Sequence, residues 1–324
     1  MNDSKTIYQQ QPTELRYVSR RKGLTPVADF SDRMVVFVHV PKAAGTNLDH
    51  FMAYMSEATG EPRIRVSGHP LGQRMSADSP DASTSFSKLK KTDLHSLRYL
   101  TGHIPYGVHE GFARRPLYMT MLREPIDRYV SHFFMGVSRG AWPADADIGA
   151  LFERGAFVAD AMTRQIAGHW RGDLPCDDAT LAEACDNLDN KFDVVGFADR
   201  AEETFQAVIA LLNWPDIAYE IHQFGVARPS EVPNRVRNAF KPFAHLDQQL
   251  YEHARHRPTP CADGLLHGLS ILPPSHQFAD KVLLALIRLR SGDDPVPFRI
   301  IEKSLFERET AALAAHGVSL KRFE

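Results

Sequence analysis

The sequence has few cysteines, almost no net charge and no long apolar run. Its three cysteines, Cys176, Cys185 and Cys261, are too few for a disulfide framework and lack the spacing of metal ligands. We therefore expect free, buried thiols and a cytoplasmic location, where thiols stay reduced.

The chain also lacks targeting, membrane and metal-binding signatures. The stretch from Met1 to Arg21 is polar and has no apolar core of a signal peptide. No apolar run reaches the ~18 residues of a membrane-spanning helix. The fifteen histidines are scattered and form no HExxH pair, so we expect no metal site. The net charge of −2 argues against a general nucleic-acid binder, so any anion site must be a local cluster of basic residues.

Predicted strands alternate with predicted helices along most of the 324 residues. Apolar stretches predict strands at 34–40, 63–66, 98–104, 117–122 and 192–198. Helical periodicity covers 46–58, 88–97, 125–137, 148–167, 178–188, 202–212, 231–240 and 247–256. This alternation indicates an α/β fold, with a P-loop-like parallel β-sheet flanked by helices. The part after residue 200 is mainly helical, and the tail from Ser275 is predicted to be helical too.

We expect one main domain with two flanking segments. Residues 1–32 are predicted to be an N-terminal arm, and 33–260 an α/β domain. Residues 261–324 are predicted to be a helical C-terminal extension packed on the same domain. The stretch 68–87 is rich in Ser, Asp, Gly and Pro, which predicts a long loop.

The first motif follows the strand at 34–40. It consists of Pro41, Lys42, Ala43, Ala44, Gly45, Thr46 and Asn47, and an amphipathic helix begins directly after it. Backbone N–H groups at a helix N-terminus, next to a lysine, bind a phosphate or sulfate ester. In the triphosphate pattern GxxxxGK[ST] the lysine directly precedes the hydroxyl residue. Here three residues separate Lys42 from Thr46, so this shorter turn should hold fewer phosphate groups.

The second motif spans Leu122 to Ser131. Arg123 ends a predicted strand, and Ser131 lies two turns into the following helix. A guanidinium and a hydroxyl at these places can bind one phosphate together. For Arg128 we expect a structural pair with Glu124 at i,i+4.

Ligands of open α/β sheets bind at the carboxyl ends of the strands. Lys42, His103 and Arg123 each follow a predicted strand, so a parallel sheet would place all three along one edge. A neutral histidine suits proton transfer near neutral pH, which makes His103 the candidate general base. His109 and Glu110 are alternatives on the next loop, whereas His39 is interpreted as a packed strand histidine.

Together the two motifs resemble sulfotransferases that use 3′-phosphoadenosine-5′-phosphosulfate (PAPS). Residues 41–47 are similar to the family's 5′-phosphosulfate loop, and 122–131 to its 3′-phosphate motif. Residues 99–107 resemble most closely the heparan sulfate 2-O-sulfotransferase branch, where His-Gly-His supplies the base. Here Thr101 occupies the first of these positions, so only His103 matches. Residues 163–165, 194–197 and 246–251 also look family-like.

The resemblance implies transfer of a sulfuryl group from PAPS to a hydroxyl of a carbohydrate or related metabolite. Lys42 and the N–H groups of residues 43–47 would stabilise the leaving phosphate, and His103 would accept the proton, with no metal required. The candidates for a sugar site are Trp142, His169, Trp170 and Arg171. For all four, we favour a role in core or surface packing over a role in sugar binding.

Two other functions stay open at this point. A P-loop kinase or NTPase could use Asp199 to hold Mg²⁺, although the place of Lys42 opposes this. A non-catalytic anion-binding protein is the other alternative, and Thr101 is the residue that suggests it. The acceptor and the oligomeric state are not encoded in any motif that we identify.

Overall fold

The computed structural model describes residues 14–19, 32–66, 96–109, 112–169, 175–220, 232–256, 278, 280–285, 298–314 and 319–323. Most of the predicted segments 68–87 and 88–97 lie outside these residues, as do Glu110, Trp170, Arg171 and Cys261. The chain divides into two compact units. Unit 1 contains Met1–Ala28, Phe205–Phe224 and Ile271–Glu324, and unit 2 contains Asp29–Thr204 and Gly225–Ser270.

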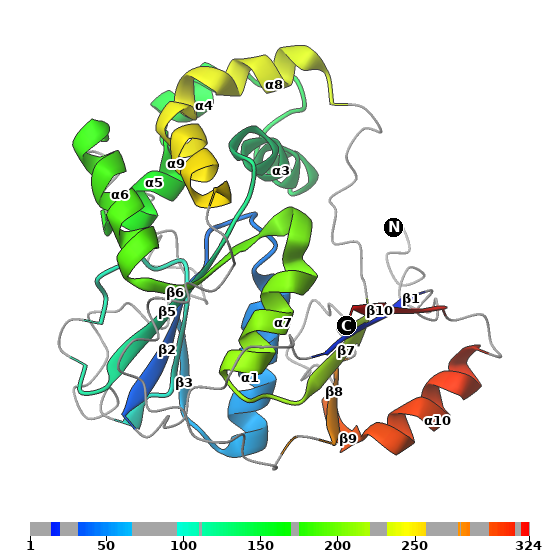
Figure 1. Ribbon diagram of the computed structural model, residues 1–324. Coiled ribbons are helices and arrows are strands. Elements are labelled where there is room, and N and C mark those ends of the chain that lie inside the picture. The colour runs from blue at the N-terminus through cyan, green and yellow to red at the C-terminus, as the bar shows by residue number, and fades with distance from the viewer. Residues whose placement is uncertain are drawn as a thin grey trace. The chain divides into compact units, whose positions relative to one another are not determined.

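Unit 2 is built on a five-stranded parallel sheet (Figure 1). Its strand order is β3-β4-β2-β5-β6, and every neighbouring pair is parallel. The bounds are β2 (Arg33–Val38), β3 (Arg63–Val66), β4 (Tyr99–Gly102), β5 (Arg115–Leu122) and β6 (Phe192–Phe197). Each strand is one that the sequence predicts, and the α/β fold class is confirmed.

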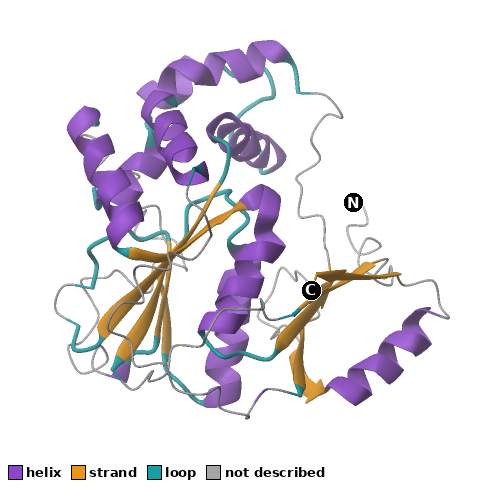
Figure 2. Cartoon of the chain, viewed as in Figure 1, coloured by secondary structure: helices purple, strands orange, loops and turns teal. Residues whose placement is uncertain are grey.

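Helices flank this sheet, as Figure 2 shows. α1 (Thr46–Thr59) packs on β4, and α6 (Asp178–Asn190) packs on β6. The other helices of unit 2 are α3 (Pro125–Ser138), α4 (Ile148–Glu153), α5 (Ala161–Ala167), α8 (Asn234–Phe240) and α9 (His245–Arg255), with short 3₁₀ turns η3 (Ala198–Arg200) and η4 (Lys241–Phe243). α7 (Ala201–Leu211) begins in unit 2 and continues into unit 1 from Phe205. Within the described part of the chain, no helix is long and apolar enough to cross a bilayer.

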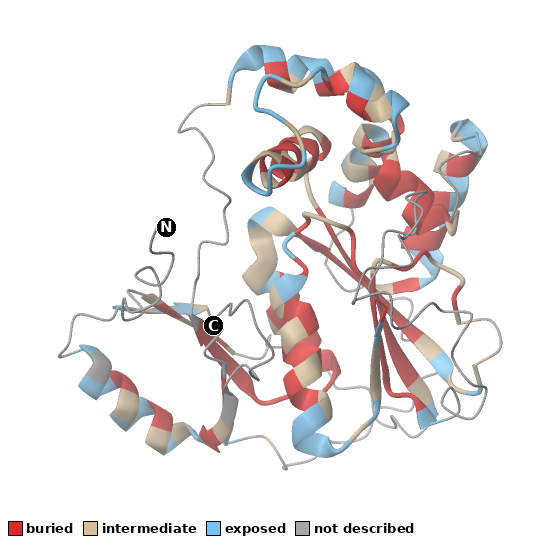
Figure 3. Cartoon of the chain, turned by 180° about the vertical axis from the view of Figure 1, so that it is seen from behind, coloured by how far each residue is buried: buried red, intermediate tan, exposed pale blue. Residues whose placement is uncertain are grey.

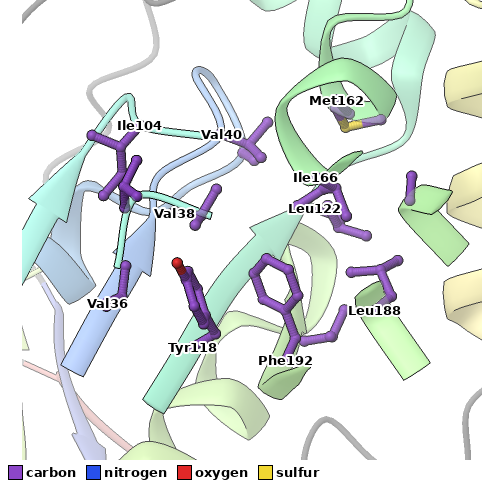
Figure 4. Close-up of a cluster of buried hydrophobic side chains, with 14 of the residues drawn as sticks. Val36, Val38, Val40, Ile104, Tyr118, Leu122, Met162, Ile166, Leu188 and Phe192 are labelled. Atoms are coloured by element: carbon purple, nitrogen blue, oxygen red, sulfur yellow. The ribbon is translucent and has the colours of Figure 1, made fainter. Parts of the chain in front are cut away.

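Alternation along β2 divides its side chains between two layers. Val36 and Val38 belong to a buried cluster with Leu122 of β5, Ile166 of α5 and Leu188 of α6 (Figure 4). The ring of Phe37 points the other way, toward the start of α1. A strand that is buried on both faces must be apolar throughout, which explains the unbroken run in the sequence.

A second buried cluster joins α3, α4 and α8, and the burial of α3 is visible in Figure 3. Tyr129 and Phe133 of α3 pack there with Phe240 of α8. Trp142 packs against the same cluster and donates its indole N–H to the Phe133 carbonyl at 3.0 Å. Packing rather than sugar stacking therefore accounts for this tryptophan.

Unit 1 contains a second five-stranded sheet, of order β10-β1-β7-β8-β9. Its strands are β1 (Glu14–Val18), β7 (Asp216–Glu220), β8 (Lys281–Ala285), β9 (Phe298–Glu302) and β10 (Ser319–Phe323), joined by helix α10 (Lys303–Ala314). The pairs β1–β10 and β7–β8 are parallel, and β1–β7 and β8–β9 are antiparallel.

This sheet corrects two expectations. Residues 14–18 form a strand inside the predicted arm, and the predicted helical extension holds three strands besides α10. The reason is that a short apolar run such as Val282 to Leu284 has no periodicity that separates a buried helix turn from a strand. Pairing with β7, which is distant in sequence, and with β9 decides that this segment is extended.

Candidate active site

The predicted convergence at the carboxyl edge of the sheet is observed. In register, Val38 of β2 lies beside Gly102 of β4 and Thr120 of β5. At this edge β2 leads to Lys42, β4 leads to His103 and β5 leads to Arg123. Sequence predicted this group, and the parallel order of the strands brings it together.

The loop after β2 has an unusual backbone. Lys42 and Ala44 both have positive φ, at 68° and 63°, whereas Gly45 is right-handed with φ −71°. Left-handed and right-handed residues in succession turn neighbouring N–H groups to one side, which forms an anion-binding concavity. The hydrogen-bond ladder of α1 begins with the Asp49 N–H, which donates to Gly45 O. The N–H groups of the turn before Asp49 therefore point out of the helix end.

Two glycines allow this edge to close. A Cβ at Gly45 would lie 2.7 Å from both His39 Cδ2 and Phe37 Cζ, so any other residue would push the loop off β2. Gly102, directly before His103, has φ +139° and faces β3, where a Cβ would lie 2.2 Å from Val66 O. Glycine is the residue that fits both the close contact and the left-handed backbone there.

The second motif reaches the first through two contacts. Arg123 Nη1 donates to the Lys42 carbonyl at 3.2 Å, and Lys42 Nζ lies 3.5 Å from Met135 Sδ on α3. Ser131 is one turn before Met135 and thus lies on the same face of α3. The structure therefore brings Lys42, Arg123 and Ser131 to one place, although they are far apart in sequence.

The predicted pair between Arg128 and Glu124 is wrong. Arg128 Nη2 lies 3.4 Å from Asp247 Oδ2 of α9, and both side chains are buried. Glu124 instead accepts from the backbone N–H groups of Ile126 and Asp127, so it caps α3. A free helix start has N–H groups without partners, and satisfying them outweighs an exposed i,i+4 pair.

His103 has a defined proton position. Its Nδ1 lies 2.8 Å from the carbonyl oxygen of His39. A carbonyl only accepts, so Nδ1 must carry the proton, and Nε2 then holds the lone pair. Burial is the largest effect on the pKa of His103 and lowers it. The charges of Arg65 and Lys42 also lower this pKa, and the hydrogen bond to His39 offsets only part of the decrease. The imidazole is thus neutral at neutral pH, as a general base requires.

His39 is packed, as expected, and its main chain joins the site. The ring stacks on Phe37 with centroids 5.3 Å apart, and burial lowers its pKa to about 3. Its carbonyl accepts from His103 and also from Gln165 Nε2 at 3.3 Å. No side-chain signal in the sequence could indicate that the functional group at this position is a carbonyl.

An ionic network around the buried Asp49 carboxylate lies beside these histidines, and no sequence motif indicates it. Asp49 of α1 binds Arg63 at 2.6 Å and Arg65 at 2.7 Å, and Arg63 also donates to Thr101 at 3.1 Å. Burial would raise the pKa of Asp49, but the two arginines and Thr101 together hold it below its usual range. Thr101, which stands where the heparan sulfate 2-O-sulfotransferase branch has its first histidine, therefore has a structural partner.

The later family-like segments support the same edge. Asp247 accepts from the Thr163 N–H at 2.8 Å and from the Thr163 hydroxyl at 3.0 Å. Gln165, at the other end of this segment, donates to Ile104 O at 2.8 Å. Residues 194–197 lie within β6.

A polar cleft of about 480 Å³ opens beside the N-terminal turn of α3. Glu124, the residue that follows Arg123 in the chain, lines this cleft. The rest of the lining comes from α8, η4 and α9 and includes Asn234, Asn238 and Gln248. Arg237, also in its lining, binds Asp127 at 2.7 Å. The cleft offers charged groups and amides that both donate and accept hydrogen bonds.

The remaining candidate residues have other partners. His109 Nδ1 lies 2.8 Å from the Tyr118 hydroxyl, and His169 lies 3.3 Å from Glu183. Asp199 is paired with Arg255 at 3.0 Å. Cys176 and Cys185 are free thiols, as expected, but they are partly exposed rather than buried. Among the residues that the structure describes, no cluster of His, Cys, Asp or Glu has the arrangement of a metal site.

Comparison with known proteins agrees with this geometry. Residues 28–253 match the family model described as "Sulfotransferase family", which covers more than half of the chain and every residue of the candidate site. No curated protein matches the chain. The matched range includes the Lys42 loop, the β5–α3 motif and the two segments joined by Asp247. The chain therefore belongs to the sulfotransferase family, whose reaction is sulfuryl transfer.

Proposed function

We propose that the chain transfers a sulfuryl group from PAPS to a hydroxyl group of a carbohydrate or related metabolite. One observation supports this most: the Arg123 guanidinium bonds the carbonyl of Lys42, while His103 lies on the adjacent strand end. Two anion-binding groups and one base thus share one edge of the sheet.

The residues present fit a nucleotide with two separate phosphate positions. Residues 42–47 would hold the 5′-phosphosulfate, because the left-handed Lys42 and Ala44 turn the backbone amides together. Arg123 and Ser131 would hold the 3′-phosphate, by charge and by a hydroxyl donor respectively. A loop this short suits a phosphosulfate better than a triphosphate.

When bound, PAPS supplies a sulfuryl group whose S–O bond to the 5′-phosphate breaks as the acceptor oxygen bonds to sulfur. The proton of the acceptor hydroxyl passes to Nε2 of His103. This nitrogen is unprotonated because the ring proton is on Nδ1, which donates to the His39 carbonyl. Lys42 and the N–H groups at the start of α1 stabilise the negative charge that develops on the leaving phosphate. General-base help of this kind is worth ~10²–10⁴-fold in rate.

The polar cleft beside Arg123 supports a carbohydrate acceptor. Sugar hydroxyls both donate and accept, and Glu124, Asn234 and Asn238 of the cleft offer both functions. A screen of hydroxyl acceptors with labelled PAPS, read by mass spectrometry, identifies the acceptor. We expect label on sugar hydroxyls, and label on amines alone would contradict O-sulfation.

A thermal-shift comparison tests the donor. We expect 3′-phosphoadenosine-5′-phosphate to raise the melting temperature without magnesium, and ATP with magnesium to do so weakly or not at all. A kinase or NTPase would give the reverse order. Folded protein that responds to neither ligand would contradict both enzyme functions and favour a non-catalytic role.

A further inference from the structure

We propose that Gln165 is a positioning residue that fixes the tautomer and orientation of His103. The inference rests on the proposed role of His103 as the base, and it adds a residue with no contact to donor or acceptor. Gln165 lies on α5, outside the two nucleotide-binding motifs, and is 1% exposed.

The side chain of Gln165 joins the two loops of the site. Its Nε2 donates to Ile104 O at 2.8 Å, in the loop after β4, and to His39 O at 3.3 Å, in the loop after β2. The backbone carbonyl of Gln165 accepts from the Tyr106 N–H at 2.9 Å. One buried residue therefore holds both the loop that leads to Lys42 and the loop that follows His103.

These contacts fix the hydrogen positions. Ile104 O and His39 O are both carbonyl acceptors, so the NH₂ end of the Gln165 amide must face them. The same reasoning assigns the proton of His103 to Nδ1. His39 O then accepts two hydrogen bonds, one from each side chain, which matches its two lone pairs. Gln165 thus fixes in space the oxygen that determines the tautomer of His103.

The position of Gln165 is itself secured by buried contacts. Asp247 accepts from the N–H groups of Met162 and Thr163, at 3.3 and 2.8 Å, in the first turn of α5. Asn187 of α6 donates to Ile166 O at 3.0 Å near the end of that helix. With both ends of α5 anchored, a shift of the Gln165 amide would require several buried hydrogen bonds to break.

Loss of the Gln165 amide has a chemical consequence at His103. Without it, the His39 peptide has one restraint fewer and can turn its carbonyl away from Nδ1. The imidazole is then free to adopt the Nε2–H tautomer, which cannot accept a proton at Nε2. In other catalytic sites, too, the group that hydrogen-bonds the second ring nitrogen of a histidine fixes its tautomer and orientation.

Gln165→Met tests this role, because methionine has a similar length and no amide. We expect kcat to fall about 10–100-fold, as ~1 Å misplacements do. The dissociation constant of 3′-phosphoadenosine-5′-phosphate should change less than about twofold, because Gln165 lies outside the two nucleotide-binding motifs. In spectra of ¹⁵N-labelled histidine, the His103 signal, assigned by its loss in His103→Gln, should gain Nε2–H character. Gln249→Met is the matched control, because exposed Gln249 bonds only His245 in the described structure.

Several outcomes overturn the proposal. Unchanged kcat and an unchanged tautomer in folded Gln165→Met protein would do so. So would a loss of kcat and nucleotide binding in equal proportion, since that indicates a structural role. If the wild-type chain transfers no sulfuryl group, the proposed function fails, but the tautomer spectra still decide whether Gln165 positions His103.

Gln165→Glu gives a second test with a distinct sign. An ionised carboxylate would face the two carbonyl oxygens, whereas the protonated acid can donate to one of them. Its turnover relative to wild type should therefore rise as the pH falls from 8 to 6. A constant ratio across this range would contradict the proposal.

Discussion

At the scale of residues, the site depends on a few costly conformations. Left-handed backbone at non-glycine residues costs about 1–3 kcal/mol each, and Lys42 and Ala44 both adopt it. Neighbouring groups hold them there: Gly45 fits closely against His39 and Phe37, and Arg123 bonds the Lys42 carbonyl. Such residues are expected where a loop is shaped in advance for an anion.

Replacement of Lys42 or Arg123 by alanine should weaken nucleotide binding. Hydrogen bonds to charged groups contribute about 1.5–3 kcal/mol, so we expect Kd for 3′-phosphoadenosine-5′-phosphate to rise about 10–100-fold in each variant. Isothermal titration calorimetry measures this. Arg255→Ala is the control for Arg123→Ala, because Arg255 pairs with Asp199 on the surface. Equal affinities in Arg123→Ala and wild type would exclude Arg123 from the phosphate site.

His103→Ala should keep nucleotide binding and lose turnover, by ~10²–10⁴-fold. In the wild type, a base must be neutral, so the rate should fall as the pH drops through the pKa of His103. Because burial lowers that pKa below the ordinary histidine value of ~6.5, the rate should be level from pH 7 to 8 and fall only at a pH below that ordinary value. His109→Phe tests the alternative base. A larger loss in that variant than in His103→Ala would transfer the role to His109.

At the scale of elements, most strands and helices could be predicted because local pattern and tertiary environment agree. Apolar runs gave the strands of unit 2, and Pro125 at the start of α3 marked that helix. Side-chain partners were less predictable. Arg128 has a suitable neighbour in Glu124, yet it binds Asp247, which is remote in sequence and arrives only when α9 packs on α3. Local spacing holds no information about such a partner.

The pairing of β5 with β6 has a polar irregularity with a pH consequence. Their register shifts between Tyr118 and Met119, and the Asp193 carboxylate accepts from the Tyr118 N–H at 2.9 Å. Burial raises the pKa of Asp193 to about 7, above its unfolded value of ~3.8. The folded state therefore binds more protons than the unfolded state between about pH 4 and 7, so stability is lost as the pH rises through this range.

Asp193→Asn should remove this loss, since an amide oxygen can still accept from Tyr118 and has no charge to bury. We expect the wild type to lose up to about 1.4 kcal/mol of unfolding free energy per pH unit from this group, and the variant to lose none of that share. Urea unfolding at pH 5 and pH 8 measures the difference. Parallel pH dependences in the two proteins would contradict the prediction.

At the scale of the whole molecule, the order of segments in the chain differs from their grouping in space. Unit 1 is assembled from three segments, and Asp216 joins them: it accepts from the Tyr17 hydroxyl and pairs with Lys303 at 2.8 Å. Burial is the largest cause that raises the pKa of Tyr17, followed by this hydrogen bond.

Asp216→Ala should loosen unit 1 and spare unit 2. Removal of this acceptor leaves the buried Tyr17 hydroxyl without its partner and costs about 1–3 kcal/mol. Hydrogen exchange followed by mass spectrometry should show faster exchange in β1, β7 and β8, with no change in β2, β4 and β5. Equal acceleration in both sheets would mean that the two units unfold as one.

The sequence by itself determined the fold class and the placement of the candidate residues Lys42, His103 and Arg123 at one edge of the sheet, because these depend on local pattern and on the general rule that parallel strands end at one edge. The tertiary structure alone decided the second sheet, the tautomer of His103, the ion pairs of Asp49 and Asp247, and the contacts of Gln165. These depend on pairing between segments remote in sequence, and on backbone carbonyls, which every residue has and no sequence motif distinguishes.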